Sequence, residues 1–278
     1  MFKYRLGIAG TGNMAEAIIK GILKSGALSS PQITAFEKNP ERSEYIELQY
    51  KIKFQPSFCD LVTNSGHILI SVKPADIVSL LKDVKSFTDL SNNVFISIAA
   101  GVPISFYERM LPGKAAVIRV MPNTPALVQK GMSVISCGRH VKQQHIDFVE
   151  KLTGSIGRYI IMEEKFQNAA TAISGSGPAY FFLFCRHLTE AAKKLGIDSE
   201  NAARLVAFTA LGAGKMLDKY ESDADYLIKM VASPGGTTEA ALREFESGGF
   251  AGIIEKAVAG AYNKAVQIQD AFIDKSEE

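Results

Sequence analysis

The sequence predicts an α/β protein with a doubly wound, largely parallel sheet in its N-terminal part and an all-helical C-terminal part. Two observations predict this fold. Short apolar or β-branched runs alternate with helical patterns through the first half of the chain. From about residue 164 only helical patterns remain, and small residues become frequent. We therefore expect two domains, residues 1–163 and 164–278.

The individual elements follow from the apolar periodicity and the turn residues. The expected strands are residues 4–9, 32–36, 67–72, 94–100, 116–121, 132–136 and 159–162. The expected C-terminal helices are residues 166–196, 199–220, 226–231, 238–246 and 250–274. Glycines and a proline interrupt the first of these helices between residues 173 and 180, which predicts a break there.

A glycine turn follows the first expected strand and opens a helix. Its residues are Gly10, Thr11, Gly12, Asn13, Met14 and Ala15. Gly10 allows the tight turn, Gly12 lets a pyrophosphate approach the backbone, and Ala15 packs helix against strand. The next strand ends at Glu37, 22 positions after Ala15, close to the ~20 expected for a ribose-binding carboxylate. This context predicts a Rossmann-type, dinucleotide-binding domain.

The sequence leaves the choice of nicotinamide cofactor open. Glu37 favours a free 2′-hydroxyl, whereas Lys38, Asn39 and Arg42 suit a 2′-phosphate. We expect NADPH to be slightly favoured and NADH to be usable. Ligands of open α/β sheets bind at the carboxyl ends of the strands. Loops at that edge add Val72, Lys73, Pro74, Ala99 and Ala100 as expected cofactor contacts, although a solvated surface lysine explains Lys73 equally well.

Composition argues against several function classes. The 278 residues carry a net charge of +2, with no basic block interleaved with aromatics. No run of about 18 apolar residues marks a membrane span, so we expect neither a nucleic-acid nor a membrane partner. The three cysteines show no CxxC spacing and the four histidines no ligand cluster, so we expect buried thiols and no metal site. Because Met1-Phe2-Lys3-Tyr4 leads directly into the first strand, we expect a cytoplasmic protein.

A second loop has the chemistry of an anion site. Ser233, Pro234, Gly235, Gly236, Thr237 and Thr238 lead into an amphipathic helix. The first turn of a helix leaves its N–H groups without internal partners, and the macrodipole adds positive charge there. The N–H groups of Gly236, Thr237 and Thr238 suit a carboxylate, with Thr237 or Thr238 as the helix cap. An ordinary turn with an N-cap is the alternative.

Two features of the helical part bear on assembly and on the substrate. Small residues recur at helical spacing at Ala203, Ala207, Ala210, Ala213 and Gly214. They allow close helix packing, either within the chain or in a helix-exchanging dimer. The helix break carries Ser174 and Ser176, which predicts either a kinked helix that lines a substrate cleft or a plain break.

Six motifs together resemble the pyrroline-5-carboxylate reductases. They are residues 10–15, 71–74 (Ser-Val-Lys-Pro), 97–101 (Ser-Ile-Ala-Ala-Gly), 121–125 (Met-Pro-Asn-Thr-Pro), 174–180 (Ser-Gly-Ser-Gly-Pro-Ala-Tyr) and 233–238. The resemblance implies reduction of L-1-pyrroline-5-carboxylate to L-proline with NAD(P)H, the last step of proline synthesis. It also implies an N-terminal Rossmann domain and a helical dimerisation domain, in dimers that often assemble into decamers.

The resemblance also implies roles for individual residues. Thr238 would lie near the ring nitrogen of the substrate as an orienting partner or proton relay, and Glu164 would lie near the substrate. The expected substrate-binding residues are Ser174, Ser176, Ser233, Gly235, Gly236, Thr237 and Thr238. The chain departs from the family at Glu37, where relatives often carry a small or hydroxyl residue. It also departs at Phe58, where some relatives place an asparagine against the adenosine.

Two alternatives remain open. A β-hydroxyacid dehydrogenase shares the glycine-rich opening and a helical second domain, but it needs a catalytic lysine near the helix break, and the first one here is Lys193. A cofactor-sensing protein without activity is the second alternative, against which the intact 233–238 loop argues.

Overall fold

The computed structural model describes residues 2–220 and 223–274, which form two compact units. The first unit holds the described residues up to Ser176 and those from Ala261 onward, and the second runs from Gly177 to Gly260. These units differ from the domains expected from the sequence, because residues 164–176 and 261–274 group with the sheet. Each unit is described by itself.

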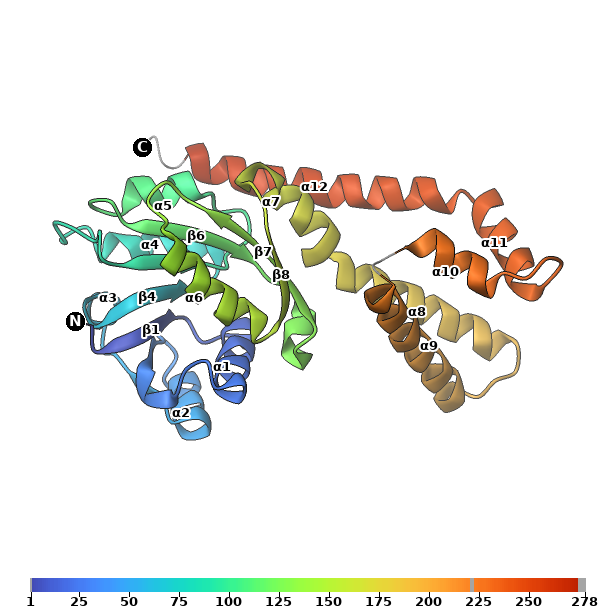
Figure 1. The fold of residues 1–278 in the computed structure, drawn as a ribbon, viewed down its shortest axis with the longest axis horizontal. Helices are drawn as coiled ribbons and strands as arrows, with labels where there is room; N and C mark the ends of the chain where they lie inside the picture. The colour runs from blue at the N-terminus through green and yellow to red at the C-terminus, as the bar shows by residue number, and fades with distance from the viewer. Residues whose placement is uncertain (1, 221–222, 275–278) are drawn as a thin grey trace. The chain divides into compact units, whose positions relative to one another are not determined.

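The first unit contains an eight-stranded sheet with the order β3-β2-β1-β4-β5-β6-β7-β8 (Figure 1). The strands are β1 Tyr4–Ala9, β2 Ile33–Phe36, β3 Lys53–Phe54, β4 Ser65–Ile70, β5 Val94–Ser97, β6 Ala116–Met121, β7 Gly131–Cys137 and β8 Gly157–Ile161. All neighbouring pairs are parallel except β6 and β7. From β1 the chain continues to β2 and β3 on one side of the sheet, and from β4 it continues to β5 and the later strands on the other side. The carboxyl ends of β1 and β4 are therefore the switch point at which such sheets bind ligands.

Helices cover both faces of the sheet. One buried cluster joins the sheet to α1 (Asn13–Ser25), α2 (Pro40–Tyr50) and α6 (Gln143–Gly154) (Figure 1). The other joins it to α3 (Phe58–Asn64), α4 (Ile77–Lys82) and α5 (Ile104–Met110). The predicted doubly wound α/β architecture is therefore confirmed.

The structure adds two details that the sequence pattern did not predict. β3 has only two residues, Lys53 and Phe54, and is too short to give a periodic signal. It pairs through Thr34 and Ala35 of β2. β7 returns antiparallel to β6, because the connection between them is only a short 3₁₀ turn, Thr124–Val128, without a crossover helix.

The predicted helix break lies in the first unit. α7 (Gln167–Ala170) passes into a π-helical turn, Thr171–Gly175, and α8 (Gly177–Lys194) begins after it. Gln167 ties this segment to β7, since its Nε2 donates to Val134 O at 3.2 Å and to Ser136 Oγ at 2.9 Å. This buried attachment explains why the compact unit extends beyond residue 163.

The C-terminal end of α12 (Phe250–Asp274) also packs within the first unit. The Phe272 ring meets Phe106 of α5 edge-on, with centroids 5.4 Å apart. Gly101 adopts φ +78°, and a Cβ there would overlap Ile268 Cγ2. A glycine is therefore required for this close approach.

The second unit is all-helical, as predicted. It contains α8, α9 (Ser199–Lys219), α10 (Ala224–Val231), α11 (Thr237–Ser247) and the first part of α12. Rings of Phe184, Phe245 and Phe250 form a cluster with centroid separations of 5.2 to 6.4 Å. Many large apolar side chains of this unit are exposed, including Phe181, Phe182, Leu205, Phe208, Leu211 and Ile253.

The expectation of buried thiols is wrong. Cys137, the last residue of β7, is exposed, and Cys59 and Cys185 are only partly buried. Within residues 2–220 and 223–274, no group of three or more His, Cys, Asp or Glu side chains is arranged to hold a metal ion. No helix in this described part is long and apolar enough to span a membrane.

Candidate functional site

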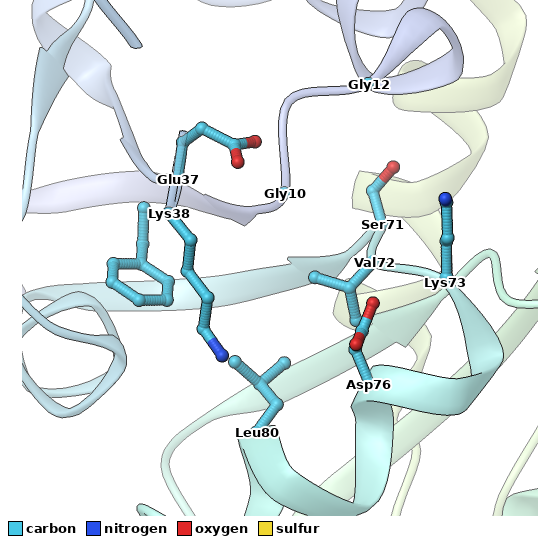
Figure 2. Close-up of a pocket in the computed structure, with 10 residues that line it drawn as sticks. Gly10, Gly12, Glu37, Lys38, Ser71, Val72, Lys73, Asp76 and Leu80 are labelled. Carbon is cyan, nitrogen blue, oxygen red and sulfur yellow. The ribbon is translucent and has the colours of Figure 1, made fainter. Parts of the chain in front are cut away.

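A pocket of about 310 Å³ opens at the carboxyl ends of β1, β2 and β4. Figure 2 shows its walls: Glu37 directs its carboxylate toward the Gly10–Gly12 turn, and Lys38 extends across the pocket toward Leu80. The lining residues are Gly10, Gly12, Phe36, Glu37, Lys38, Ser71, Val72, Lys73, Asp76 and Leu80. The pocket therefore lies at the switch point between β1 and β4, and six of its residues are among those expected to contact the cofactor.

The glycine turn is built for close approach of a ligand. Gly10 has φ +85°, and a Cβ there would lie 2.9 Å from Val72 Cγ1 and 3.0 Å from Ser71 O. Gly12 is the N-cap of α1, and no side chain caps this helix end. The first-turn N–H groups of Asn13 and Met14 are therefore available for an anion. Ala15 is fully buried against the sheet, where a larger side chain would separate helix and strand.

Glu37 is held by hydrogen bonds to the turn. Its Oε2 accepts from Thr11 N at 2.8 Å and from Thr11 Oγ1 at 3.0 Å, and its Oε1 accepts from Asn39 N at 3.1 Å. Partial burial raises the pKa of this carboxyl, but the backbone and hydroxyl donors outweigh it and leave the pKa below its usual value. Glu37 therefore presents an ionised carboxylate at the pocket.

Arg42 is held on the other side of Thr11 and does not line the pocket. Its Nε donates to Thr11 O at 2.7 Å, and its Nη2 pairs with Glu16. Its guanidinium also lies 5.2 Å from the centroid of the Tyr45 ring. Glu37 thus binds the N–H of Thr11, and Arg42 binds the C=O of the same residue. These are the two residues with opposite expected preferences at the ribose 2′ position.

The other expected cofactor contacts divide into two groups. Val72 and Lys73 line the pocket, and Lys73 also precedes the 3₁₀ turn Pro74–Asp76. Those that do not line the pocket are Thr11, Asn13, Met14, Ala15, Asn39, Pro74, Ala99 and Ala100. Ala99 is buried, and its N–H donates to Ser97 Oγ at 3.3 Å.

The π-helical turn is linked to the loop after β6. Asn123 Nδ2 donates to both Ser174 O and Ser174 Oγ at 3.2 Å, and Asn123 Oδ1 accepts from Met132 N at 2.8 Å. Ser176 N donates to Thr171 O at 2.9 Å and closes the turn. The structure thus joins the 121–125 and 174–180 motifs through one asparagine.

Glu164 is engaged by a buried cation that the sequence analysis missed. Arg119 lies in β6 with its side chain 2% exposed, and its Nη1 reaches Glu164 Oε1 at 3.2 Å. Glu164 Oε1 also accepts from Ile104 N at 2.7 Å, at the start of α5, and Arg119 Nη1 lies 3.4 Å from Gln269 Oε1. An arginine between apolar strand residues was the available signal, because such a buried charge needs a partner.

The 233–238 loop lies in the second unit. Gly235 adopts φ +70°, and Gly236 N donates to Ser233 O at 3.0 Å. Gly236, rather than Thr237 or Thr238, is the N-cap of α11, because the chain already enters the helix at Thr237. Since the N–H of Gly236 is used within the turn, Thr237 and Thr238 supply the first-turn N–H groups for an anion.

Two family models match the chain. The model described as pyrroline-5-carboxylate reductase dimerisation matches residues 164–268. The model described as NADP oxidoreductase, coenzyme F420-dependent, matches residues 5–101. A pyrroline-5-carboxylate reductase of Mycobacterium tuberculosis is 34% identical over 287 residues, which cover 95% of this chain and 97% of that protein. The chain belongs to the pyrroline-5-carboxylate reductase family.

Solved structures agree with this assignment. A pyrroline-5-carboxylate reductase from Coxiella burnetii matches with a TM-score of 0.86 at 29% identity, over 96% of this chain and 98% of that chain. Plasmodium falciparum pyrroline carboxylate reductase, solved with NADP bound, matches with a TM-score of 0.84 at 28% identity, over 97% of this chain and 100% of that chain. The resemblance inferred from the six motifs is confirmed, and so is the predicted class, an NAD(P)-dependent oxidoreductase.

Proposed function

We propose that this member of the family reduces L-1-pyrroline-5-carboxylate to L-proline by hydride transfer from NAD(P)H, the last step of proline synthesis. The observation that carries the proposal is the pocket at the β1/β4 switch point, with its glycine turn and the uncapped start of α1. Family membership over nearly the whole chain supports the same reaction.

The residues present fit a dinucleotide. The uncapped N–H groups of Asn13 and Met14 would hold the pyrophosphate, Glu37 and Lys38 would meet the adenosine ribose, and Lys73 would add positive charge. We propose NADP(H) as a cofactor, which the NADP bound in the Plasmodium falciparum enzyme supports, and NAD(H) as a second cofactor that the same pocket accepts. When bound, the cofactor supplies the hydride.

The chain's own groups in the 233–238 loop have two tasks in this reaction. The N–H groups of Thr237 and Thr238 bind the substrate carboxylate, because the start of α11 carries no side-chain cap. Thr238 orients or relays the proton that the ring nitrogen takes as the imine carbon receives the hydride. The C=N double bond becomes a C–N single bond, and the product is a secondary amine.

The remaining expected substrate contacts are Ser174, Ser176, Ser233, Gly235 and Gly236. Ser174 Oγ already accepts a hydrogen bond from Asn123, which fixes its position. Glu164 is proposed to lie near the substrate. Because its carboxylate is bound to Arg119 and to Ile104 N, its contribution is electrostatic rather than proton transfer.

The proposal includes assembly and location. Residues 1–163 form the proposed cofactor domain and residues 164–278 the proposed dimerisation domain, and the dimerisation model, which matches residues 164–268, supports a homo-oligomer. The exposed apolar side chains of the second unit also favour association. We propose that the protein forms dimers, that these dimers assemble further into a decamer, and that the protein is cytoplasmic.

The direct test follows oxidation of NADPH, and separately of NADH, at 340 nm with pyrroline-5-carboxylate, together with proline formation. Thr238→Ala should lower turnover by about 100-fold with cofactor affinity nearly unchanged, because the hydroxyl acts on the substrate alone. Thr88→Ala, at an exposed position between α4 and β5, is the matched control and should retain full turnover. Unchanged turnover of Thr238→Ala would remove this residue from the mechanism. A folded wild-type protein that binds cofactor without turnover would favour the sensor alternative.

A further inference from the structure

Arg42 is the strongest cation that the sequence offers for a 2′-phosphate, but the structure engages it elsewhere. Its Nε donates to Thr11 O at 2.7 Å, and its Nη2 donates to Glu16 on α1. The Tyr45 ring, with its centroid 5.2 Å from the guanidinium, adds a third contact. The side chain is only 25% exposed, so these contacts define its position.

Glu16 is equally well anchored. Its Oε1 accepts from Tyr50 OH at 2.8 Å and from Tyr45 OH at 3.2 Å, while its Oε2 binds Arg42. Burial raises the pKa of the Glu16 carboxyl, but Arg42 and the two phenols outweigh it and lower the pKa overall. Glu16 is therefore charged and neutralises Arg42.

Glu37 leaves the ribose end of the pocket with a negative charge. Its carboxylate is fixed by Thr11 and Asn39 and is directed toward the glycine turn, as Figure 2 shows. A carboxylate at this position accepts a hydrogen bond from a ribose 2′-hydroxyl and repels a 2′-phosphate. With Arg42 neutralised, Lys38 is the lining cation nearest in sequence to Glu37.

We infer that Glu16 is a specificity-determining residue: it holds Arg42 against α1 and away from a 2′-phosphate, so that NAD(H) binds at least as tightly as NADP(H). Glu16 does not line the pocket, so it acts through Arg42 as a positioning residue. The inference rests on the proposed dinucleotide pocket and adds to it a rule for the choice between the two cofactors.

Calorimetric titration of the purified full-length protein with NAD⁺ and with NADP⁺ tests this without catalysis. The wild type should bind NADP⁺ no more tightly than NAD⁺. Glu16→Gln keeps a hydrogen-bonding side chain but removes the charge, and should tighten NADP⁺ binding about tenfold while NAD⁺ binding changes less than twofold. Glu41→Gln, an exposed charge change next to Arg42, is the control and should leave the ratio of the two dissociation constants unchanged.

The positioning role is tested through Arg42. Arg42→Met alone should change the ratio of the NAD⁺ and NADP⁺ dissociation constants less than twofold. In the Arg42→Met background, Glu16→Gln should not change this ratio further. A tenfold loss of NADP⁺ binding in Arg42→Met, tighter wild-type binding of NADP⁺ than of NAD⁺, or an equal shift in Glu41→Gln would overturn the inference. If the folded wild type binds neither nucleotide, the dinucleotide pocket itself is wrong, which is a separate result.

Discussion

Replacing Glu164 by Gln should destabilise the protein, because the substitution leaves the Arg119 charge buried without a counter-charge. Arg119 is 2% exposed and Glu164 is 31% exposed, with 3.2 Å between Nη1 and Oε1. Removal of one partner of a fully buried pair costs about 3–5 kcal/mol. The partial exposure of Glu164 reduces this to about 2 kcal/mol, since water screens the exposed side. A chain of this size then loses roughly 3–4 °C in Tm.

Differential scanning fluorimetry and urea unfolding measure this loss, and the neighbouring glutamate supplies the control. Glu163 pairs with Lys165 at 2.8 Å, but both side chains are well exposed, at 71% and 64%. Glu163→Gln should therefore change stability by less than about 0.5 kcal/mol. Arg119→Met combined with Glu164→Gln should recover much of the loss, because an apolar side chain needs no counter-charge. Equal stability of the two single glutamine variants would refute this reasoning.

Two further predictions concern the first unit. His67 stacks on Phe148, with ring centroids 3.7 Å apart, and burial lowers its pKa from 6.5 to about 4. As pH falls, the unfolded chain binds the proton before the folded protein does, so about 2 kcal/mol of stability should be lost between pH 7 and pH 5. Urea titrations at both pH values measure this loss, and His67→Gln should remove the pH dependence. Gly101→Ala should cost at least about 2 kcal/mol more than Gly26→Ala in the same urea titrations. Both glycines have positive φ, but only at Gly101 would a Cβ meet Ile268, so equal losses would show that this contact is unimportant.

The sequence predicts those parts of the fold and of the site that depend only on residues close together in the chain. The glycine turn, the helix it opens and Glu37 lie within one strand-helix-strand segment, and the structure places Gly10, Gly12 and Glu37 in one pocket. The helix break was equally local, because glycines and a proline disrupt the helix wherever it packs. Five C-terminal helical segments were predicted within a few residues for the same reason.

The missed features depend on pairs that are distant in sequence. Arg119 and Glu164 are 45 positions apart, and Arg42 and Glu16 are 26 apart. No periodicity reports such a pair, so the sequence predicts that Arg42 suits a 2′-phosphate but does not predict its contact with Glu16. The helix cap was misassigned because a threonine hydroxyl is a frequent cap, whereas the chain here enters the helix one residue earlier, with Gly236 as the cap.

The second unit adds a physical reason to treat the oligomer as the working form. Phe181, Phe182 and Phe208 are exposed by 69%, 68% and 74%, so these side chains contribute little burial energy to the folding of an isolated helical unit. A second copy would remove them from water and stabilise the folded helices by mass action. The proposed carboxylate loop lies in this same unit and leads directly into α11. Because association would stabilise the unit that carries this loop, the turnover of Thr238 variants should be compared at protein concentrations where the oligomer persists.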